Sequence, residues 1–379
     1  MVSLDDLEAL RKIDEHGMLD FYMRWPEAIR EALEMAEALD IPDELRTGEM
    51  TIRYGRPELL AVAGMGGSII GGDILSDVLW DELDVPIQVC RGYGLPAWVG
   101  PGALVVVVSY SGNTEETLVA FHEALRRGCM VIAITSGGHL AKLCTRTGVP
   151  LLSVPGGRAT RMSFPYLFFP LLVFLERFEL ARGLRKRAER AAELLSSMAK
   201  ELGPERPVGE NEAKKLALEL VGTVPLVYGF KWLRSVAYRL KTQFNENSKI
   251  PSFSNWFPAM NHHEIVGWEA GEAFLKVFSA LLLRSRGEPP EIRRRIELTK
   301  EIALDKASKI LEIWAKGSSK LEEAVSALYI GDMVSIYLAL ARGVDPYRTK
   351  SIDVLKAGMA ELGVAERVEK AVGELIREK

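Results

Sequence analysis

Four polar side chains follow an apolar run and surround Gly112. They are Ser109, Ser111, Asn113 and Thr114. The preceding run, Val105 to Val108, is predicted to be a strand buried on both faces, and a helix is predicted from Glu115 to Arg127. Hydroxyls, backbone amides and the positive end of a helix dipole would then converge without any Lys or Arg. One Ser or Thr alone would indicate only a helix cap, but this group favours a site for a phosphate monoester.

A second turn, rich in glycine, follows the apolar segment Leu59 to Ala63 and extends from Gly64 to Asp73. Glycines between a strand and a helix let backbone amides approach a ligand closely. The turn begins like a dinucleotide fingerprint, but Ile69 occupies the third small position and would obstruct packing of the helix on the strand. The sequence also has no Gly-Lys-Ser or Gly-Lys-Thr of a nucleotide P-loop. We therefore predict no cofactor.

Three further segments carry titratable side chains. They are residues 155–161 with Arg158 and Arg161, residues 245–249 with Glu246, and residues 261–268 with His262 and His263. Each could be an ordinary solvated charge on a loop or at a helix end. Adjacent histidines on a strand point to opposite faces, and no third ligand follows at a recognisable spacing, so we predict no metal site.

Short apolar segments alternate with helical ones, which is typical of a parallel sheet covered by helices on both faces. The predicted strands are residues 59–63, 87–90, 105–108, 130–135 and 151–154, then 224–228, 249–253 and 273–283. From Ile292 onward the chain is predicted to be helical, with Ile302, Ile310, Leu311 and Trp314 in the core. The fold class is thus α/β, with two doubly wound parallel sheets and N- and C-terminal helices.

The length of 379 residues indicates two domains. We predict N-terminal helices in residues 1–42 and a first sheet domain in residues 43–202. Residues 203–207 form the predicted linker, and residues 208–379 form the second sheet domain with the C-terminal helices. The polar loops described above would lie where the strands end, at the edge at which open sheets bind ligands.

Charge and cysteine content limit the partners and the compartment. The 48 Lys and Arg nearly balance the 52 Asp and Glu, so the net charge is -4 and we expect binding neither to nucleic acid nor to an anionic membrane. Three widely spaced cysteines favour a reducing compartment, which is the cytoplasm by default. The N-terminus is acidic and the longest apolar run, Phe164 to Leu175, is short and contains two prolines, so we expect neither export nor membrane insertion.

The segment Ser109-x-Ser-Gly-Asn-Thr-x-Glu-Thr resembles the phosphate-binding signature of sugar isomerase domains. The segments Asn245-Glu-Asn-Ser-Lys249 and Asn261-His262 resemble the archaeal-type bifunctional phosphoglucose/phosphomannose isomerases, and the resemblance covers nearly the whole chain. It implies that both predicted sheet domains are sugar isomerase domains. It also implies a homodimer, in which His262 acts across the interface on the partner's substrate.

The resemblance implies a role for each matching residue. The implied substrate-binding residues are Gly67, Ser68, Ser109, Ser111, Thr114 and Thr349, and the implied catalytic residues are Arg161, Glu246, His262 and Lys356. Arg161 would stabilise developing negative charge on the sugar, although the residues that follow it depart from the family pattern and leave Arg158 as the alternative. His262 is assigned the ring-opening role, because His263 stands where the family more often has Asn.

Interconversion of an aldose and a ketose moves a proton between C1 and C2 through an enediolate. The reaction needs a carboxylate base, an acid for ring opening and stabilisation of negative charge, which Glu246, His262 and Arg161 could supply. The expected reaction converts glucose 6-phosphate, and with it mannose 6-phosphate, to fructose 6-phosphate. Two alternatives remain: a phosphosugar-sensing module without catalysis, and an amino-sugar phosphate isomerase that uses an amine donor.

Overall fold

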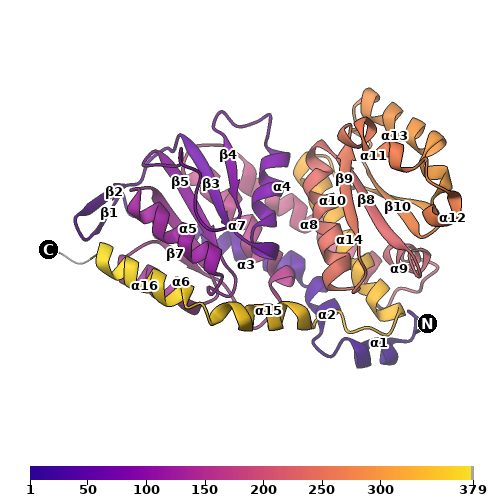
Figure 1. Cartoon of the computed structure of the whole chain (residues 1–379), viewed down its shortest axis with the longest axis horizontal. Coiled ribbons are helices and arrows are strands. Elements are labelled where there is room, and N and C mark those ends of the chain that lie inside the picture. The colour runs from indigo at the N-terminus through magenta and orange to yellow at the C-terminus, as the bar shows by residue number, and fades with distance from the viewer. Residues whose placement is uncertain (377–379) are drawn as a thin grey trace. The chain divides into compact units, whose positions relative to one another are not determined.

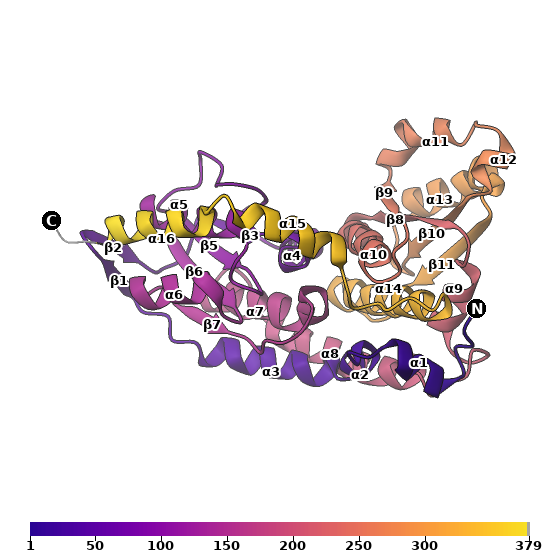
Figure 2. The ribbon, with the colours of Figure 1, turned by 60° about the horizontal axis from the view of Figure 1, so that its bottom comes forward.

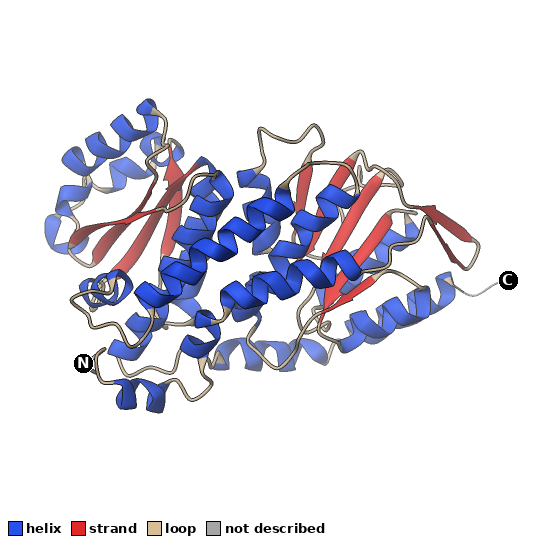
Figure 3. Ribbon diagram, turned by 180° about the vertical axis from the view of Figure 1, so that it is seen from behind, coloured by secondary structure: helices blue, strands red, loops and turns tan. Residues whose placement is uncertain are grey.

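The computed structural model describes residues 1–376 and divides into two compact units, each built around one parallel sheet (Figure 1). The first-sheet unit consists of Glu27–Ala188 and the segment from Thr349 onward, and the second-sheet unit of Met1–Pro26 and Glu189–Arg348. In each unit helices lie against the strands of the sheet (Figure 3). The predicted α/β class with two parallel sheets is confirmed.

The first-sheet unit contains five parallel strands in the order β4-β3-β5-β6-β7. They are β3 (Leu59–Gly64), β4 (Ile87–Cys90), β5 (Ala103–Val108), β6 (Met130–Thr135) and β7 (Leu151–Ser153). Every residue of β3, β5 and β6 is buried, as expected for strands covered on both faces. The strand order reverses direction between β3 and β5, so the crevice at their carboxyl ends is the position at which such sheets bind ligands.

Helices and a short hairpin complete this unit. They are α3 (Trp25–Ala38), α4 (Ile70–Val78), α5 (Glu115–Arg126), α6 (Gly138–Thr147), α7 (Phe164–Arg177), α15 (Lys350–Ala360), α16 (Val364–Leu375), β1 (Glu44–Thr47) and β2 (Met50–Arg53). Helix α16 packs on α5 and α6 (Figure 2). Its Val364, Val368 and Val372 recur every four residues and are buried, so one apolar stripe attaches the end of the chain to this unit.

The second-sheet unit contains four parallel strands in the order β11-β10-β8-β9. They are β8 (Val224–Phe230), β9 (Phe253–Phe257), β10 (Phe278–Arg284) and β11 (Lys309–Trp314). Its helices are α1 (Leu7–Ile13), α2 (Met18–Met23), α9 (Glu212–Glu219), α10 (Arg234–Glu246), α11 (Glu264–Gly267), α12 (Glu272–Leu275), α13 (Pro290–Ile302) and α14 (Lys320–Ala341), and α8 (Leu184–Leu202) extends into this unit. The strand order repeats that of the first four strands of the other sheet, with the reversal between β8 and β10.

Helix α14 is the core of the second-sheet unit. It is long and apolar enough to cross a membrane by those two criteria, but its apolar window is entirely buried inside the protein. Twenty of its 22 residues are buried, and they include Asp332 and Ser335. A helix buried on all sides is apolar all round because it is the centre of a core.

Three predicted elements of the second unit were wrong. The strand expected at 249–253 is β9, which starts at Phe253, and the first part of the strand expected at 273–283 is the short helix α12. The helix expected from Ile292 onward is interrupted by β11, which contains Ile310, Leu311 and Trp314. Ile302 is 64% exposed and Trp314 is 39% exposed, so neither is a core residue. A short apolar run fits helical and strand spacing alike, which explains these errors.

The compact units also differ from the predicted domain boundaries at both ends of the chain. Residues 1–26 belong to the second-sheet unit, although they were expected to form a separate N-terminal segment, and the chain from Thr349 onward belongs to the first-sheet unit. Residues 377–379 of the predicted second domain lie outside the described residues. The apolar stripe of α16 that packs on α5 and α6 accounts for the placement of the C-terminal segment.

Candidate active site

Loops at the carboxyl ends of β3 and β5 bring three of the predicted phosphate-binding hydroxyls together. The backbone amide of Tyr110 donates to Ser68 Oγ (3.2 Å), and Ser109 Oγ donates to Thr114 Oγ1 (3.1 Å). Ser68 ends the short 3₁₀ helix η1 (Gly66–Ser68), and Thr114 is the N-cap of α5. First-turn amides of a helix have no intrahelical acceptor, so α5 directs donors toward these hydroxyls.

Gly112 allows the loop after β5 to pack closely on the loop after β6. Its φ is +70°, and a Cβ at this position would lie 1.8 Å from the carbonyl oxygen of Gly137. The side chain of Asn113 is held in the same contact, because its Oδ1 accepts from the backbone amide of His139 (3.1 Å). The supporting loop was not predicted from the sequence, although the pair Gly137-Gly138, which begins two residues after the end of the predicted strand 130–135, was a usable signal.

Ser111 projects from the same loop and is exposed. Its hydroxyl accepts from the backbone amide of Asn113 (3.3 Å), which fixes the turn without burying the oxygen. Ser111 is therefore accessible to a ligand at the loop that Ser109 and Thr114 also border.

Arg161 lies beside Gly67. A Cβ on Gly67 would be 3.3 Å from the backbone nitrogen and Cα of Arg161, so η1 and the 3₁₀ helix η2 (Thr160–Ser163) are in direct contact. Arg161 is only 4% exposed, whereas Arg158 is half-buried. The backbone of Arg158 is fixed by Tyr110, whose hydroxyl accepts from the Arg158 amide (3.2 Å) and donates to Pro155 O (3.0 Å). Both arginines thus belong to the turn that contacts the loops after β3 and β5.

Glu246 is the last residue of α10 and is half-buried. The three residues after it are fastened to their surroundings: Asn247 Nδ2 donates to Ser335 Oγ (2.8 Å), and Ser248 Oγ donates to Ser335 O (2.6 Å). Lys249 has a φ of +53° and its Nζ donates to the carbonyl oxygen of Glu246 (2.7 Å). The strained backbone is held by these contacts, and they fix the point from which the Glu246 carboxylate projects.

His262 ends the 3₁₀ helix η4 (Ala259–His262), which follows the edge strand β9. The segment is anchored on both sides of the histidines. Asn261 Nδ2 donates to Thr299 Oγ1 (2.8 Å), and the Glu264 carboxylate accepts from Tyr228 Oη (2.6 Å) and from Asn255 Nδ2 (2.5 Å). His262 and His263 are both exposed, so a rigid support presents them away from the core of their own unit.

Thr349 and Lys356 belong to the first-sheet unit. Thr349 is the half-buried N-cap of α15, and Lys356 is exposed on a helix that has no buried residue within the part of the chain the structure describes. The predicted site residues therefore fall into two sets. The first-sheet unit holds Gly67, Ser68, Ser109, Ser111, Thr114, Arg161, Thr349 and Lys356, and the second-sheet unit holds Glu246 and His262.

Comparison with known proteins identifies the family. A bifunctional phosphoglucose/phosphomannose isomerase of Caldicellulosiruptor bescii is 34% identical to this chain over 346 residues, which cover 91% of this chain and 99% of the relative. The chain belongs to this family. Residues 209–359 also match the family described as the bacterial phospho-glucose isomerase C-terminal SIS domain. The family membership that the sequence resemblance implied is confirmed.

Two other similarities concern the fold and a neighbouring activity. The crystal structure of a hypothetical protein from Thermus thermophilus has a TM-score of 0.72 with 16% identity and covers 93% of both chains, which supports the fold alone. A D-glucosamine-6-phosphate 4-epimerase of Sulfolobus acidocaldarius is 33% identical over 249 residues, 65% of this chain and 72% of that protein. The two relatives are thus named for phosphosugar substrates but for different reactions.

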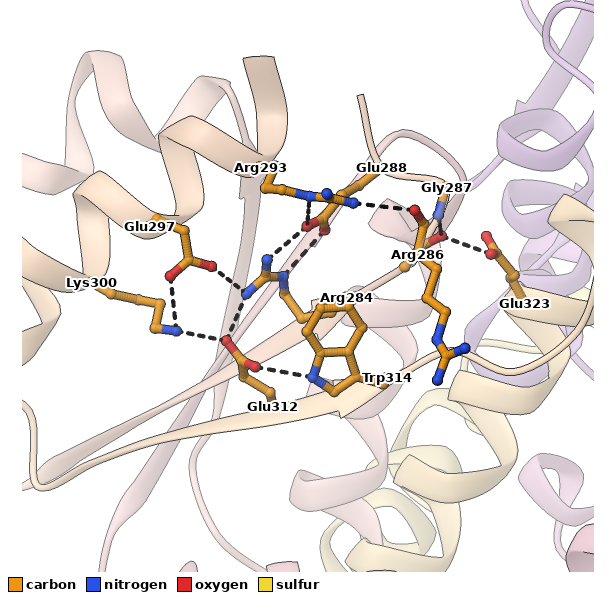
Figure 4. A network of polar contacts seen from close by, with 11 residues as sticks. Arg284, Arg286, Gly287, Glu288, Arg293, Glu297, Lys300, Glu312, Trp314 and Glu323 are labelled. Carbon is orange, nitrogen blue, oxygen red and sulfur yellow. Dashed lines mark hydrogen bonds and ion pairs between the residues drawn. The ribbon is translucent and has the colours of Figure 1, made fainter. Parts of the chain in front are cut away.

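In the second sheet, a serine and several carboxylates lie around the end of β10, the strand that corresponds to β5 of the first sheet. Ser285 directly follows β10, as Ser109 directly follows β5, and Ser285 Oγ donates to Glu323 Oε1 (2.7 Å). Arg284 Nη2 donates to Glu288 Oε1 (2.6 Å), and its Nη1 donates to Glu312 Oε1 (2.6 Å) (Figure 4). This network fastens α13 and β11 to the end of β10.

Arg284→Met should destabilise the protein by about 3 to 5 kcal/mol, because the Glu288 side chain, which is 0% exposed, would remain buried without its main cationic partner. Urea unfolding followed by circular dichroism measures the change. Arg294→Met, an exposed arginine on α13, is the control and should alter stability by no more than about 0.5 kcal/mol. Equal effects of the two substitutions would contradict a structural role of the Arg284 network.

Proposed function

We propose that this protein interconverts glucose 6-phosphate and mannose 6-phosphate with fructose 6-phosphate. The observation that carries the proposal is the convergence of Ser68, Ser109 and Thr114 beside Gly67 and Arg161, at the strand-order reversal of the first sheet. This arrangement offers neutral donors to a phosphate and a buried cation nearby, in a chain whose family relatives are named for the two isomerisations.

The proposed reaction assigns one step to each group. The hydroxyls of Ser68, Ser109, Ser111 and Thr114 and the first amides of α5 bind the phosphate, with Gly67 and Thr349 contacting the substrate. His262 donates a proton to the ring oxygen as the ring opens, and Lys356 assists on the ring side. Glu246 then takes the proton from C2 of the aldose, Arg161 stabilises the enediolate oxygen, and Glu246 returns the proton to C1.

We further propose a homodimer in the cytoplasm. His262 is exposed on a rigid support, which suits an imidazole that acts on the substrate of the partner subunit.

The proposed compartment rests on the cysteines. Cys90, Cys129 and Cys144 are free thiols, and burial raises the pKa of Cys90 to about 11, which keeps that thiol protonated and unreactive. Unpaired cysteines are typical of reducing compartments.

A coupled assay tests the activity and its alternatives. Purified protein should form fructose 6-phosphate from glucose 6-phosphate and from mannose 6-phosphate in the absence of ammonia. An amino-sugar phosphate isomerase would need ammonia to consume fructose 6-phosphate, and a sensing module would bind the sugar without turnover. The similarity to the 4-epimerase adds a fourth arm, in which glucosamine 6-phosphate is incubated and the products are resolved by NMR. Turnover only in that arm would overturn the proposal.

Ser109→Ala combined with Ser111→Ala should raise KM far more than it lowers kcat, because the phosphate is remote from C1 and C2. Each hydrogen bond lost to a charged group costs about 1.5 to 3 kcal/mol. Steady-state kinetics with fructose 6-phosphate measures the effect. Thr145→Ala is the control, since Thr145 is exposed and its Oγ1 donates to the Ala141 carbonyl within α6. An unchanged KM in the double variant would place the phosphate elsewhere.

A further inference from the structure

Helix α10 carries a polar face that ends at Glu246. Arg239, Gln243, Glu246 and Asn247 are spaced four, seven and eight residues from the first, so they lie on one side of the helix. This side faces α14, against which α10 packs (Figure 2). Arg239, Gln243 and Asn247 are essentially inaccessible to solvent, and Glu246 is half-buried where the face ends.

Asp332 of α14 is the buried carboxylate that faces Arg239. Arg239 Nη2 donates to Asp332 Oδ2 (2.6 Å), and Arg239 Nε lies 3.2 Å from each oxygen of the same carboxylate. Tyr22 Oη donates to Asp332 Oδ2 (2.8 Å) and accepts from Gln243 Nε2 (3.2 Å). One guanidinium and one carboxylate thus form a charge-balanced pair inside the core.

A second set of bonds connects this pair with the backbone after Glu246. Ser335 Oγ donates to Asp332 O (2.6 Å) and accepts from Asn247 Nδ2 (2.8 Å). The turn of α14 that positions Asp332 therefore also holds the residue next to Glu246. The contact between α10 and α14 therefore has two effects. It fixes the backbone beside Glu246, and it neutralises the charge of Arg239 on the same face of α10.

We propose that Asp332 is a positioning residue for the reaction, which cancels the charge of Arg239 and so prevents that charge from acting on the Glu246 carboxylate at the end of the same helix face. The inference rests on the proposed function, because it takes Glu246 as the base. Nothing in the sequence motif of Glu246 indicates this partner, which is 86 residues later in the chain and on another helix.

The magnitude follows from the helix geometry. Seven residues along a helix correspond to roughly 10 Å, and at an effective dielectric constant of about 20 one uncompensated charge at that distance shifts a proton equilibrium by about one pH unit. The two sites do interact. Burial would lower the pKa of the Arg239 guanidinium, but Asp332, Tyr22 and Glu246 outweigh burial and the pKa is raised.

Other charged groups around Glu246 stay constant in the test. Lys249 Nζ donates to the carbonyl oxygens of Glu246 (2.7 Å), Asn247 (3.3 Å) and Asp345 (2.8 Å), and Arg342 donates to the Ser248 carbonyl oxygen. Asp14 interacts electrostatically with Asp345. Each of these groups is left intact by substitutions at Asp332, Arg239 and Gln243.

The test compares the pH dependence of kcat/KM for Asp332→Asn and for Arg239→Met combined with Asp332→Leu. Asp332→Asn keeps the shape and leaves the Arg239 cation unbalanced, which favours the ionised form of Glu246. The acid limb should therefore move to lower pH by about one unit, and kcat on the plateau should fall about threefold because the base is weaker. The double variant removes both charges and should return the acid limb to its wild-type position. A folded Asp332→Asn protein with an unmoved limb, or a double variant with the same shift, would overturn the inference.

Gln243→Glu provides a test of opposite sign, should Asp332→Asn fail to fold. It adds a negative charge to the same helix face, so the acid limb should move to higher pH, and an unmoved limb would again overturn the inference. Glu246→Gln in the wild-type background separates the two proposals. If that variant keeps its activity, the proposed function of Glu246 fails. If Glu246→Gln is inactive but the acid limbs of Asp332→Asn and Gln243→Glu do not move, only the role of Asp332 fails.

Discussion

Glu246→Gln is expected to reduce kcat roughly 10² to 10⁴-fold, the range that general base catalysis contributes. The amide keeps the shape and the hydrogen-bonding reach of the side chain but cannot accept the proton from C2. Binding of fructose 6-phosphate should change little, because the proposed phosphate site is formed by the loops after β3 and β5, and Asn247 to Lys249 still fix the backbone. Turnover and exchange of solvent tritium into C1 of fructose 6-phosphate measure the loss together.

The control for this substitution is Glu269→Gln, which removes an exposed carboxylate from the same unit. It should leave turnover unchanged and stability within about 0.5 kcal/mol. A Glu246→Gln protein that binds the substrate and exchanges the proton at the wild-type rate would show that another residue is the base.

Arg161→Gln is expected to lower kcat by about 10² to 10³-fold, since one preorganised donor to a developing oxyanion is worth that much in other enzymes. Arg161 is buried beside Gly67, so its guanidinium needs little reorganisation when charge develops. The KM for fructose 6-phosphate should rise far less than kcat falls.

Arg158→Gln is the matched variant, because Arg158 lies in the same turn and is half-buried. It should reduce kcat by less than tenfold, about 1.4 kcal/mol of transition-state stabilisation. The reverse order of the two effects would assign the enediolate to Arg158 and correct the role taken from the family motif.

The first sheet was predictable because its central strands β3, β5 and β6 are almost entirely apolar and are followed by turns that contain glycine. The observed β4 and β6 have the predicted bounds, and β5 begins only two residues before the predicted run. The second sheet was harder, because β11 is a six-residue strand with mixed burial that lies between the helices α13 and α14. Its spacing is compatible with a continuing helix, and only pairing with β10 distinguishes the two.

In the candidate site too, features built from neighbouring residues were predictable from the sequence, whereas contacts between residues far apart in the sequence were not. The phosphate loop was predicted from one short segment, because strand, Gly112 and helix cap are contiguous. The partner of Arg239 is 93 residues away, and Tyr22, which bonds the same carboxylate, is 310 residues from Asp332. Spacing along a single sequence carries no information about such pairs.

Neither sheet unit corresponds to a continuous stretch of chain. Met1–Pro26 packs with the second sheet, and the last helices pack with the first. During synthesis the first sheet leaves the ribosome long before α16, so the surface of α5 and α6 that α16 covers stays open until α16 has itself been synthesised. The N-terminal helices likewise wait for the strands they join. Completion of the first-sheet unit therefore waits for the synthesis of α16, and cutting the chain at residues 203–207 would yield two fragments that each lack a segment of their own core.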